Sequence, residues 1–192
     1  MLPDLISFIV ECEKLKAVER RSSPVGMARR ENSAEHSWSA VIAASVLIPG
    51  LAPDLDLLRV LKMLAIHDIV EIDAGDTFCY GDQTGKAERE EAAATRIFGI
   101  LPTKLREEFH AIWHEFEAAE TAEAKFANAI DRLLPLLQNS HNNGSSWREN
   151  KVTYEQVYER NARINDGNSE LWKYTMDLIE SAHQKGLLPK AK

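Results

Sequence analysis

The most informative segment of the chain reads Ala65-Ile66-His67-Asp68-Ile69-Val70-Glu71-Ile72-Asp73-Ala74-Gly75-Asp76. His67 and Asp68 are adjacent near the end of an apolar helical run. Glu71 follows His67 at i+4, so on a helix their side chains project from the same face. The Asp68 carboxylate is close enough in sequence to share a ligand with His67. The segment therefore predicts a metal-binding group with an acid or base beside it.

His36 and Asp131 are the candidates for the remaining ligands. His36 falls in the first turn of a helix that Asn32 or Ser33 can cap. Asp131 interrupts an apolar stripe, with Ala127 at i−4 and Leu134 at i+3. A carboxylate that faces a core is costly unless it is paired or bound to a cation. A metal ligand is the favoured interpretation, and an aspartate that caps a neighbouring helix is the alternative.

The four residues His36, His67, Asp68 and Asp131 make a donor set of two imidazoles and two carboxylates. This set suits Mn²⁺, Co²⁺, Fe²⁺, Ni²⁺ or Zn²⁺ and leaves positions for water or a substrate oxygen. Such an ion polarises a phosphoryl oxygen and lowers the pKa of bound water. Glu71 is placed to handle a proton of that water or of the leaving group, and Asp76 to hold a substrate hydroxyl or act as a second carboxylate.

Composition restricts the class of protein. The chain has 192 residues, of which 44% are hydrophobic, and its net charge is −7. These values predict one domain with a sizeable core and argue against binding to a nucleic acid polymer or an anionic membrane. Cys12 and Cys79 suggest neither a disulfide framework nor a cysteine zinc site. The apolar run 5–10 is short and has acidic flanks, so we expect no signal peptide and a soluble, cytoplasmic protein.

Helical periodicity predicts the fold class. The predicted helices span about 3–17, 34–47, 86–100, 104–118, 121–138, 153–165 and 169–185, with a further helix that opens at residue 54 or 56 and carries His67 near its C-terminal end. No strand-like alternation or internal repeat is present. We therefore expect an all-α helical bundle that forms a single domain over 1–192, with its core at about 30–140. The segments 77–85 and 139–151 are predicted loops.

A basic loop precedes the helix of His36. Residues 14–30 contain two lysines and four arginines against Glu19, a local balance of +5 in an acidic protein. Arg21 and Arg30 are the candidate phosphate clamps, because a guanidinium offers paired donors to phosphate oxygens. A solvated basic loop is the alternative. His110 and His114 also have metal-like i, i+4 spacing, but no further ligand is evident in sequence, and we interpret them as surface or packing residues.

The spacing of His36, His67-Asp68 and Asp131 resembles the HD-domain metal-dependent phosphohydrolases. The strings Arg30-Glu31-Asn32-Ser33-Ala34-Glu35-His36-Ser37, His67-Asp68-Ile69-Val70-Glu71 and Ala74-Gly75-Asp76 are similar to the branch that contains 5′-deoxynucleotidases. The resemblance implies an HD-domain helical fold, usually a homodimer, with one divalent ion, Mg²⁺ being a further possibility, held by these four residues. It also implies hydrolysis of nucleoside 5′-monophosphates. Glu71 and Asp76 match the catalytic and substrate-contacting acids.

The chain departs from that branch at its phosphate-contacting arginine. Arg21 is the best match, but Ser22-Ser23-Pro24 follows it where those enzymes have tryptophan, and the loop 78–82 lacks their proline-rich character. The alternatives within enzymes are a phosphodiesterase and a nucleoside triphosphohydrolase of the same superfamily. Outside enzymes, the alternative is a helical regulatory module whose metal is structural. An open coordination sphere argues against that module, because structural sites are normally closed by protein ligands.

Overall fold

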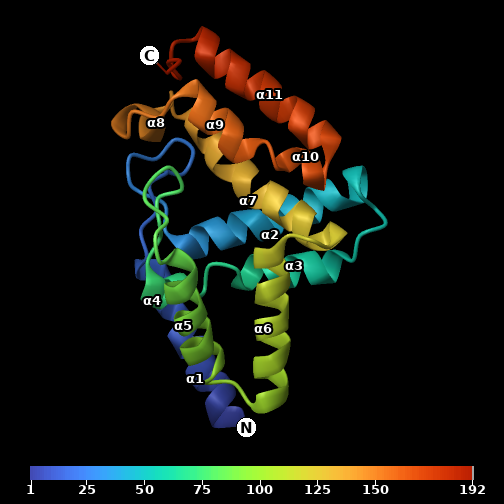
Figure 1. The fold of residues 1–192 in the computed structure, drawn as a ribbon. Helices are drawn as coiled ribbons and strands as arrows, with labels where there is room; N and C mark the ends of the chain where they lie inside the picture. The colour runs from blue at the N-terminus through green and yellow to red at the C-terminus, as the bar shows by residue number, and fades with distance from the viewer. Residues whose placement is uncertain (192) are drawn as a thin grey trace.

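The computed structural model describes residues 1–191, and they form a bundle of helices (Figure 1). Within these residues there is no strand, and an isolated β-bridge joins Glu19 to Asn32. The all-α prediction is confirmed. No helix among them combines the length and apolarity needed to cross a bilayer. The elements are α1 (Leu2–Cys12), η1 (Glu13–Ala17), α2 (Ser33–Leu51), α3 (Leu57–Ile66), α4 (Glu71–Ala74), α5 (Lys86–Phe98), α6 (Thr103–Ala118), α7 (Ala122–His141), α8 (Ser145–Glu149), α9 (Tyr154–Asn161), α10 (Ile164–Gly167) and α11 (Ser169–Gln184).

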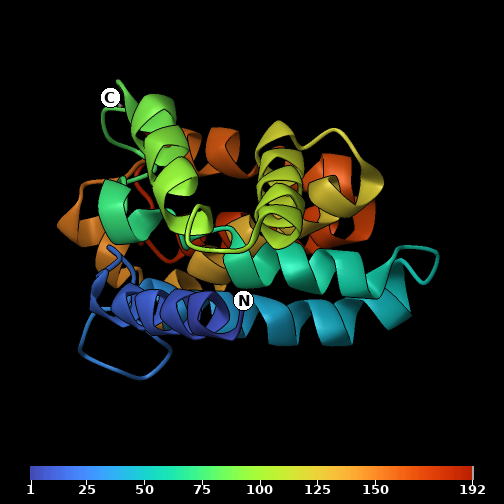
Figure 2. The ribbon, with the colours of Figure 1, turned by 90° about the horizontal axis from the view of Figure 1, so that it is seen from below.

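Helix α7 lies at the centre of the bundle. It packs against α2, α3 and α6 on one side and against α9, α10 and α11 on the other (Figure 1). Its buried stripe includes Phe126, Ile130 and Leu133. Helices α1, α5 and α6 project together from one end of the bundle, which Figure 2 shows from below. The central position of α7 brings Asp131, the neighbour of Ile130, into the interior.

Capping interactions set the register of the two long helices that carry site residues. The Asn32 side chain accepts the Glu35 N–H at 3.0 Å, and Glu35 Oε2 accepts the Asn32 N–H at 3.2 Å. This capping box satisfies two of the N–H groups that α2 leaves free at its start. The Thr121 hydroxyl caps α7 in a similar way. Both caps are local, so the faces on which His36 and Asp131 lie follow directly from the sequence.

Helices α2 and α3 differ from the sequence predictions. Helix α2 continues past the expected stop to Leu51, because Pro49 lies in its last turn, where one missing N–H interrupts little of the hydrogen-bonding ladder. Helix α3 ends at Ile66, and residues 67–70 form a turn before α4. In this turn the Glu71 N–H donates to the Asp68 carbonyl at 2.9 Å, an i→i−3 bond. The prediction that His67 and Glu71 share one helix face is therefore wrong.

Smaller differences concern the two ends of the chain. Helix α1 ends at Cys12 and continues as the 3-10 turn η1. The predicted loop 139–151 includes the last residues of α7 and the short helix α8. The helix predicted over 153–165 is divided into α9 and α10. At the break, Asn161 Nδ2 donates to the Val157 carbonyl at 2.7 Å, an interaction by which asparagine competes with the helical backbone.

The basic loop between η1 and α2 is held by backbone hydrogen bonds. The Arg20 N–H donates to the Glu31 carbonyl at 2.8 Å, and the Glu31 N–H donates to the Ser22 carbonyl at 3.0 Å. At the tip, Gly26 has φ +74°, which favours glycine, and its N–H donates to Asn142 Oδ1 at 3.0 Å. The two arms of this loop therefore have a fixed register, and this register turns the side chains of Arg20 and Glu31 inward.

Candidate metal centre and active-site cavity

Three segments that are distant in the sequence bring the candidate metal ligands together. His36 comes from the first turn of α2, His67 and Asp68 from the turn after α3, and Asp131 from the middle of α7. His36 Nε2 lies 2.9 Å from Asp131 Oδ1. His67 Nε2 lies 3.2 Å from Asp68 Oδ1 and 3.6 Å from Asp131 Oδ1. The four side chains thus converge on one centre.

The rings of both histidines are oriented by acceptors on the side away from that centre. The Nδ1 atom of His67 lies 2.9 Å from the Leu64 carbonyl, which only a protonated nitrogen can satisfy. Its Nε2 is left buried without a hydrogen-bond partner. The Nδ1 atom of His36 is buried without a hydrogen-bond partner, and the charged oxygen beside it is Glu31 Oε2, at 3.6 Å. Each ring therefore has a support on its Nδ1 side and directs Nε2 toward the carboxylates, as histidines that bind metals do.

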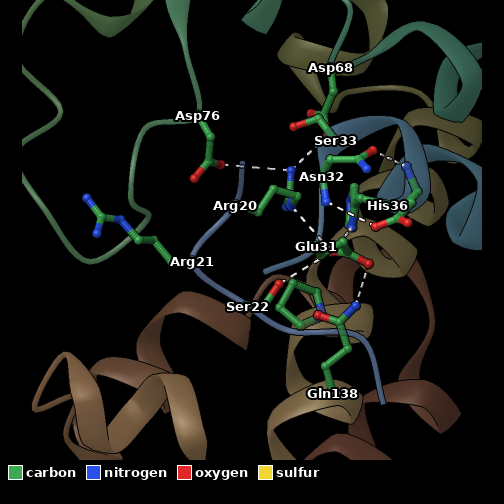
Figure 3. A network of polar contacts seen from close by, with 12 residues as sticks. Arg20, Arg21, Ser22, Glu31, Asn32, Ser33, His36, Asp68, Asp76 and Gln138 are labelled. Atoms are coloured by element: carbon green, nitrogen blue, oxygen red, sulfur yellow. Dashed lines mark hydrogen bonds and ion pairs between the residues drawn. The ribbon is translucent and has the colours of Figure 1, made fainter. Parts of the chain in front are cut away.

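The centre carries an excess of negative charge. Figure 3 shows Arg20 among the carboxylates, and its Nη1 lies 2.8 Å from Asp68 Oδ2, 4.0 Å from Glu71 Oε2 and 3.9 Å from Asp76 Oδ1. Burial lowers the pKa of His67, but the negative charges of Asp68 and Asp131 outweigh it and raise that pKa to about 9.

An environment that holds a proton on a buried imidazole also favours a metal cation. The donor set and its charge, together with the unpaired Nε2 atom of His67, fit one divalent ion.

Glu31 is a functional candidate that the sequence reasoning did not single out. Its side chain is 2% exposed, beside His36 Nδ1 and 3.6 Å from Arg20 Nε. It accepts hydrogen bonds from Gln138 Nε2 at 2.5 Å and from Ser22 Oγ at 3.3 Å. A carboxylate behind an imidazole makes the ring a better ligand and fixes its orientation. The sequence feature that could have pointed to Glu31 is its position directly before the Asn32 cap, five residues ahead of His36.

Arg20, rather than the predicted phosphate clamps Arg21 and Arg30, lies against the candidate metal ligands. The Arg20 side chain is 12% exposed and points to the metal centre, whereas Arg21 is exposed, lines the cavity and points away from Arg20 in Figure 3. Arg30 lies outside the cavity, where its guanidinium donates to the Arg21 carbonyl at 2.5 Å and pairs with Glu149. The reason is the register of the loop, in which alternate side chains face opposite sides and Arg20 falls on the inner one.

Glu71 and Asp76 lie beside the metal centre. Glu71 is buried, and its Oε2 accepts the Ser33 hydroxyl at 2.6 Å. Burial and the nearby Asp68 raise the pKa of Glu71 well above its ordinary value. Burial, followed by the charge of Asp68, also raises the pKa of Asp76, although Arg20 opposes the shift. Two carboxyl groups whose pKa values are raised therefore line the space next to the candidate ligands.

A cavity of about 1030 Å³, including its open mouth, extends from this centre toward solvent. Residues 77–80 of the segment predicted as a loop form part of its wall. Helices α7, α8 and α9 contribute Arg132, Trp147 and Arg160 to the wall. The mixture of charged and aromatic side chains in its walls suits a small polar organic ligand.

His110 and His114 have a partner that was not evident from the sequence. His114 Nε2 lies 3.6 Å from Glu91 Oε2, and one donor atom from each of the three residues falls within 4.8 Å of the others. Helices α5 and α6 bring them together on the surface, away from the cavity. The structure thus adds a third potential donor, Glu91, to a histidine pair for which the sequence suggested none.

Comparison with known proteins places this geometry in a family. A family model described as HD domain matches residues 12–172. Human 5′-deoxynucleotidase HDDC2 is 31% identical over 140 residues, which cover 71% of this chain and 67% of the relative. The Xenopus laevis 5′-deoxynucleotidase HDDC2 is 28% identical over 84% of this chain and 75% of its own length. The resemblance derived from the sequence is thereby confirmed.

Solved structures agree with this assignment. A predicted metal-dependent phosphohydrolase from Magnetospirillum magnetotacticum MS-1 has a TM-score of 0.94 and 44% identity, and the match covers 98% of this chain and 95% of that protein. A conserved hypothetical protein from Pyrococcus furiosus has a TM-score of 0.66 at 20% identity, which shows a common fold. The convergent histidines and aspartates, the helical bundle and these matches lead to one conclusion. The chain belongs to the HD domain family.

Proposed function

We propose that the protein is a metal-dependent phosphohydrolase that converts (deoxy)nucleoside 5′-monophosphates to nucleoside and phosphate. The observation that carries the proposal is the convergence of His36, His67, Asp68 and Asp131 at the inner end of a cavity, with Glu71 and Arg20 beside them. One divalent ion held by these four residues would polarise the phosphoryl oxygen and activate a water for attack. We assign phosphate binding, proton transfer and substrate contact to side chains of the protein.

Arg20 is suited to hold the phosphoryl group. Its guanidinium faces the cavity, and its Nε is buried without a hydrogen-bond partner. A phosphate oxygen at this end of the cavity would accept from Arg20, and the positive charge would offset the carboxylates that otherwise repel an anion. Because Asp68 and Glu31 fix the guanidinium before substrate arrives, little side-chain entropy is lost on binding.

Glu71 and Asp76 are suited to proton transfer and substrate contact. The Ser33 hydroxyl holds Glu71 Oε2 in place, and the raised pKa of the Glu71 carboxyl suits a group that carries a proton to a leaving oxygen. We assign it the proton that passes to the leaving 5′ oxygen when the P–O bond breaks. Asp76 lies at the edge of the cavity, where its carboxyl can hydrogen-bond a sugar hydroxyl.

The relatives named 5′-deoxynucleotidase support the choice of substrate class. A direct test measures phosphate release from ribo- and deoxynucleoside 5′-monophosphates and from unrelated phosphate monoesters, each with Mn²⁺, Co²⁺, Mg²⁺ and Zn²⁺ and with chelator. We expect metal-dependent release that favours nucleotides. Release from other monoesters alone would overturn the nucleotidase assignment. Metal binding without release from any compound would indicate a regulatory module.

We also propose that the protein forms a homodimer through α2. Trp38, Ile42 and Val46 recur at i, i+4 and i+8, and their side chains are 67%, 46% and 69% exposed. An apolar stripe of this kind on a single helix is costly in water and is typical of an interface. A two-fold dimer places the same stripe on both sides, so that each copy covers the other.

A further inference from the structure

A second group of cations lies in the cavity away from Arg20. Arg132 on α7 and Arg160 on α9 line the main cavity, and both also line a shallow depression that continues it past Cys79 and Tyr80. Arg163 lines the same depression. Within residues 1–191, none of these three guanidinium groups forms an ion pair, in contrast to Arg20. Glu159 also lines the depression, so three guanidinium groups face one carboxylate there and a net positive charge remains.

Arg132 is the least satisfied member of this group. Its Nη1 donates to the Arg160 carbonyl at 2.7 Å, but its Nε is buried without a hydrogen-bond partner. Arg160, which lines the same cavity and the same depression, carries a like charge. Partly buried like charges repel one another, and buried donors without acceptors are rare in native proteins. An anion between these side chains would remove both costs.

The helix geometry separates this group from the metal centre. Arg132 follows Asp131 directly on α7, and successive side chains of a helix point about 100° apart. Asp131 turns toward His36, whereas Arg132 turns toward α9 and the Arg160 carbonyl. At the metal end, Arg20 and a divalent ion already provide positive charge for the scissile phosphate. The three arginines are consequently available for a different anionic group of the same ligand.

We propose that Arg132, Arg160 and Arg163 form a second anion subsite, and that the preferred substrates carry a second phosphate set apart from the scissile one. Nucleoside 3′,5′-bisphosphates have this chemistry. The inference rests on the proposed function, because it refines the substrate of the same cavity. Guanidinium groups match phosphate oxygens in pairs, and three of them around one depression exceed what an uncharged base or sugar requires.

The decisive experiment compares kcat/KM for adenosine 3′,5′-bisphosphate, adenosine 5′-monophosphate and adenosine 5′-diphosphate. We expect the wild type to prefer the bisphosphate, and Arg160→Gln to reduce the bisphosphate-to-monophosphate ratio about tenfold, mainly through KM. The diphosphate distinguishes a separate second phosphate from a contiguous one. Arg160 is chosen because its guanidinium makes no hydrogen bond or ion pair within residues 1–191, so its replacement spares the fold. Arg148→Gln, an exposed arginine on α8 outside the cavity, is the matched control and should keep the wild-type ratio.

Calorimetric titration separates this inference from the proposed function. Adenosine 3′,5′-bisphosphate and adenosine 5′-monophosphate are titrated into the metal-loaded Glu71→Gln variant, in which we expect turnover to be slowed. The same two ligands are titrated into the double variant Glu71→Gln/Arg160→Gln. Tighter binding of the bisphosphate that is lost in the double variant supports the subsite, even if the wild type hydrolyses neither compound. Equal losses for both ligands would show that Arg160 holds the scissile phosphate and would overturn the inference. The inference would also be overturned if Arg160→Gln left the preference for the bisphosphate over the monophosphate unchanged in both assays.

Discussion

Glu31 provides the sharpest test of the candidate metal centre, because its carboxylate lies behind His36 and is not itself one of the four candidate ligands. The replacement Glu31→Gln keeps the size and most hydrogen-bonding atoms of the side chain but removes its charge. In the wild type this charge lies 3.6 Å from His36 Nδ1 and is almost fully removed from water, with 2% of the side chain exposed. Loss of a carboxylate behind a histidine ligand typically lowers metal affinity 10- to 100-fold, or about 1.4 to 2.7 kcal/mol.

The magnitude should fall within this range because two effects add. The imidazole of His36 loses its support, and the anionic field that attracts the cation becomes weaker. Arg20 also loses one of the carboxylates that hold it, since Glu31 Oε2 lies 3.6 Å from its Nε. The hydrogen bond from Gln138 can persist to the amide oxygen of the new side chain, so we expect little change in overall helicity.

The assay is a calorimetric titration of metal-free protein with Mn²⁺ or Co²⁺, which measures metal affinity. Circular dichroism and thermal unfolding check that the fold is intact. Glu149→Gln is the matched control, because Glu149 pairs with the same loop through Arg30 but is 56% exposed and remote from the ligands. It should bind metal as the wild type does. Wild-type affinity in Glu31→Gln, with the fold intact, would refute the role assigned to this carboxylate.

Three further predictions concern the metal ligand, the interface and the pH dependence of stability. His67→Ala should abolish phosphate release and weaken metal binding while helicity persists, whereas His141→Ala, at an exposed position, should retain activity; loss of the fold in His67→Ala would count against a ligand role. Val46→Lys should shift the protein from dimer to monomer in size-exclusion chromatography with light scattering. Val25→Lys places the same charge at another exposed valine, in the loop before α2, and should leave the dimer intact; a wild-type monomer would contradict the proposed interface. The ion pairs with Lys14 and Arg96 lower the pKa of Glu11 below 4.5, so they stabilise the folded state above that pH and are lost as the pH falls through the lowered pKa. Glu11→Gln should therefore reduce the free energy of unfolding at pH 7 by up to about 1 kcal/mol, and in denaturant titrations this difference should shrink as the pH falls through the lowered pKa of Glu11. A difference that stays constant as the pH falls would refute this assignment.

Local features of the sequence were sufficient to predict most helices and the four candidate ligands that the structure brings together. The Asn32 and Thr121 caps begin α2 and α7 through contacts within one turn, which is why their starts could be predicted. The boundary between α3 and α4 could not, because residues 67–70 favour a tight turn whose i→i−3 bonds depend on the docking of Glu71 against Ser33. Packing, rather than propensity, ended that helix.

The sequence by itself determined the all-α class, the residue types at the metal centre and the family to which the chain belongs. Only the tertiary structure decided which arginine enters the site, since Arg20 and Arg21 are adjacent and a one-residue register in the loop turns them to opposite sides. It also decided that Glu31 supports His36 and that Glu91 joins His110 and His114. In each case the contact joins segments that approach one another only after the helices pack, and no local pattern records that approach.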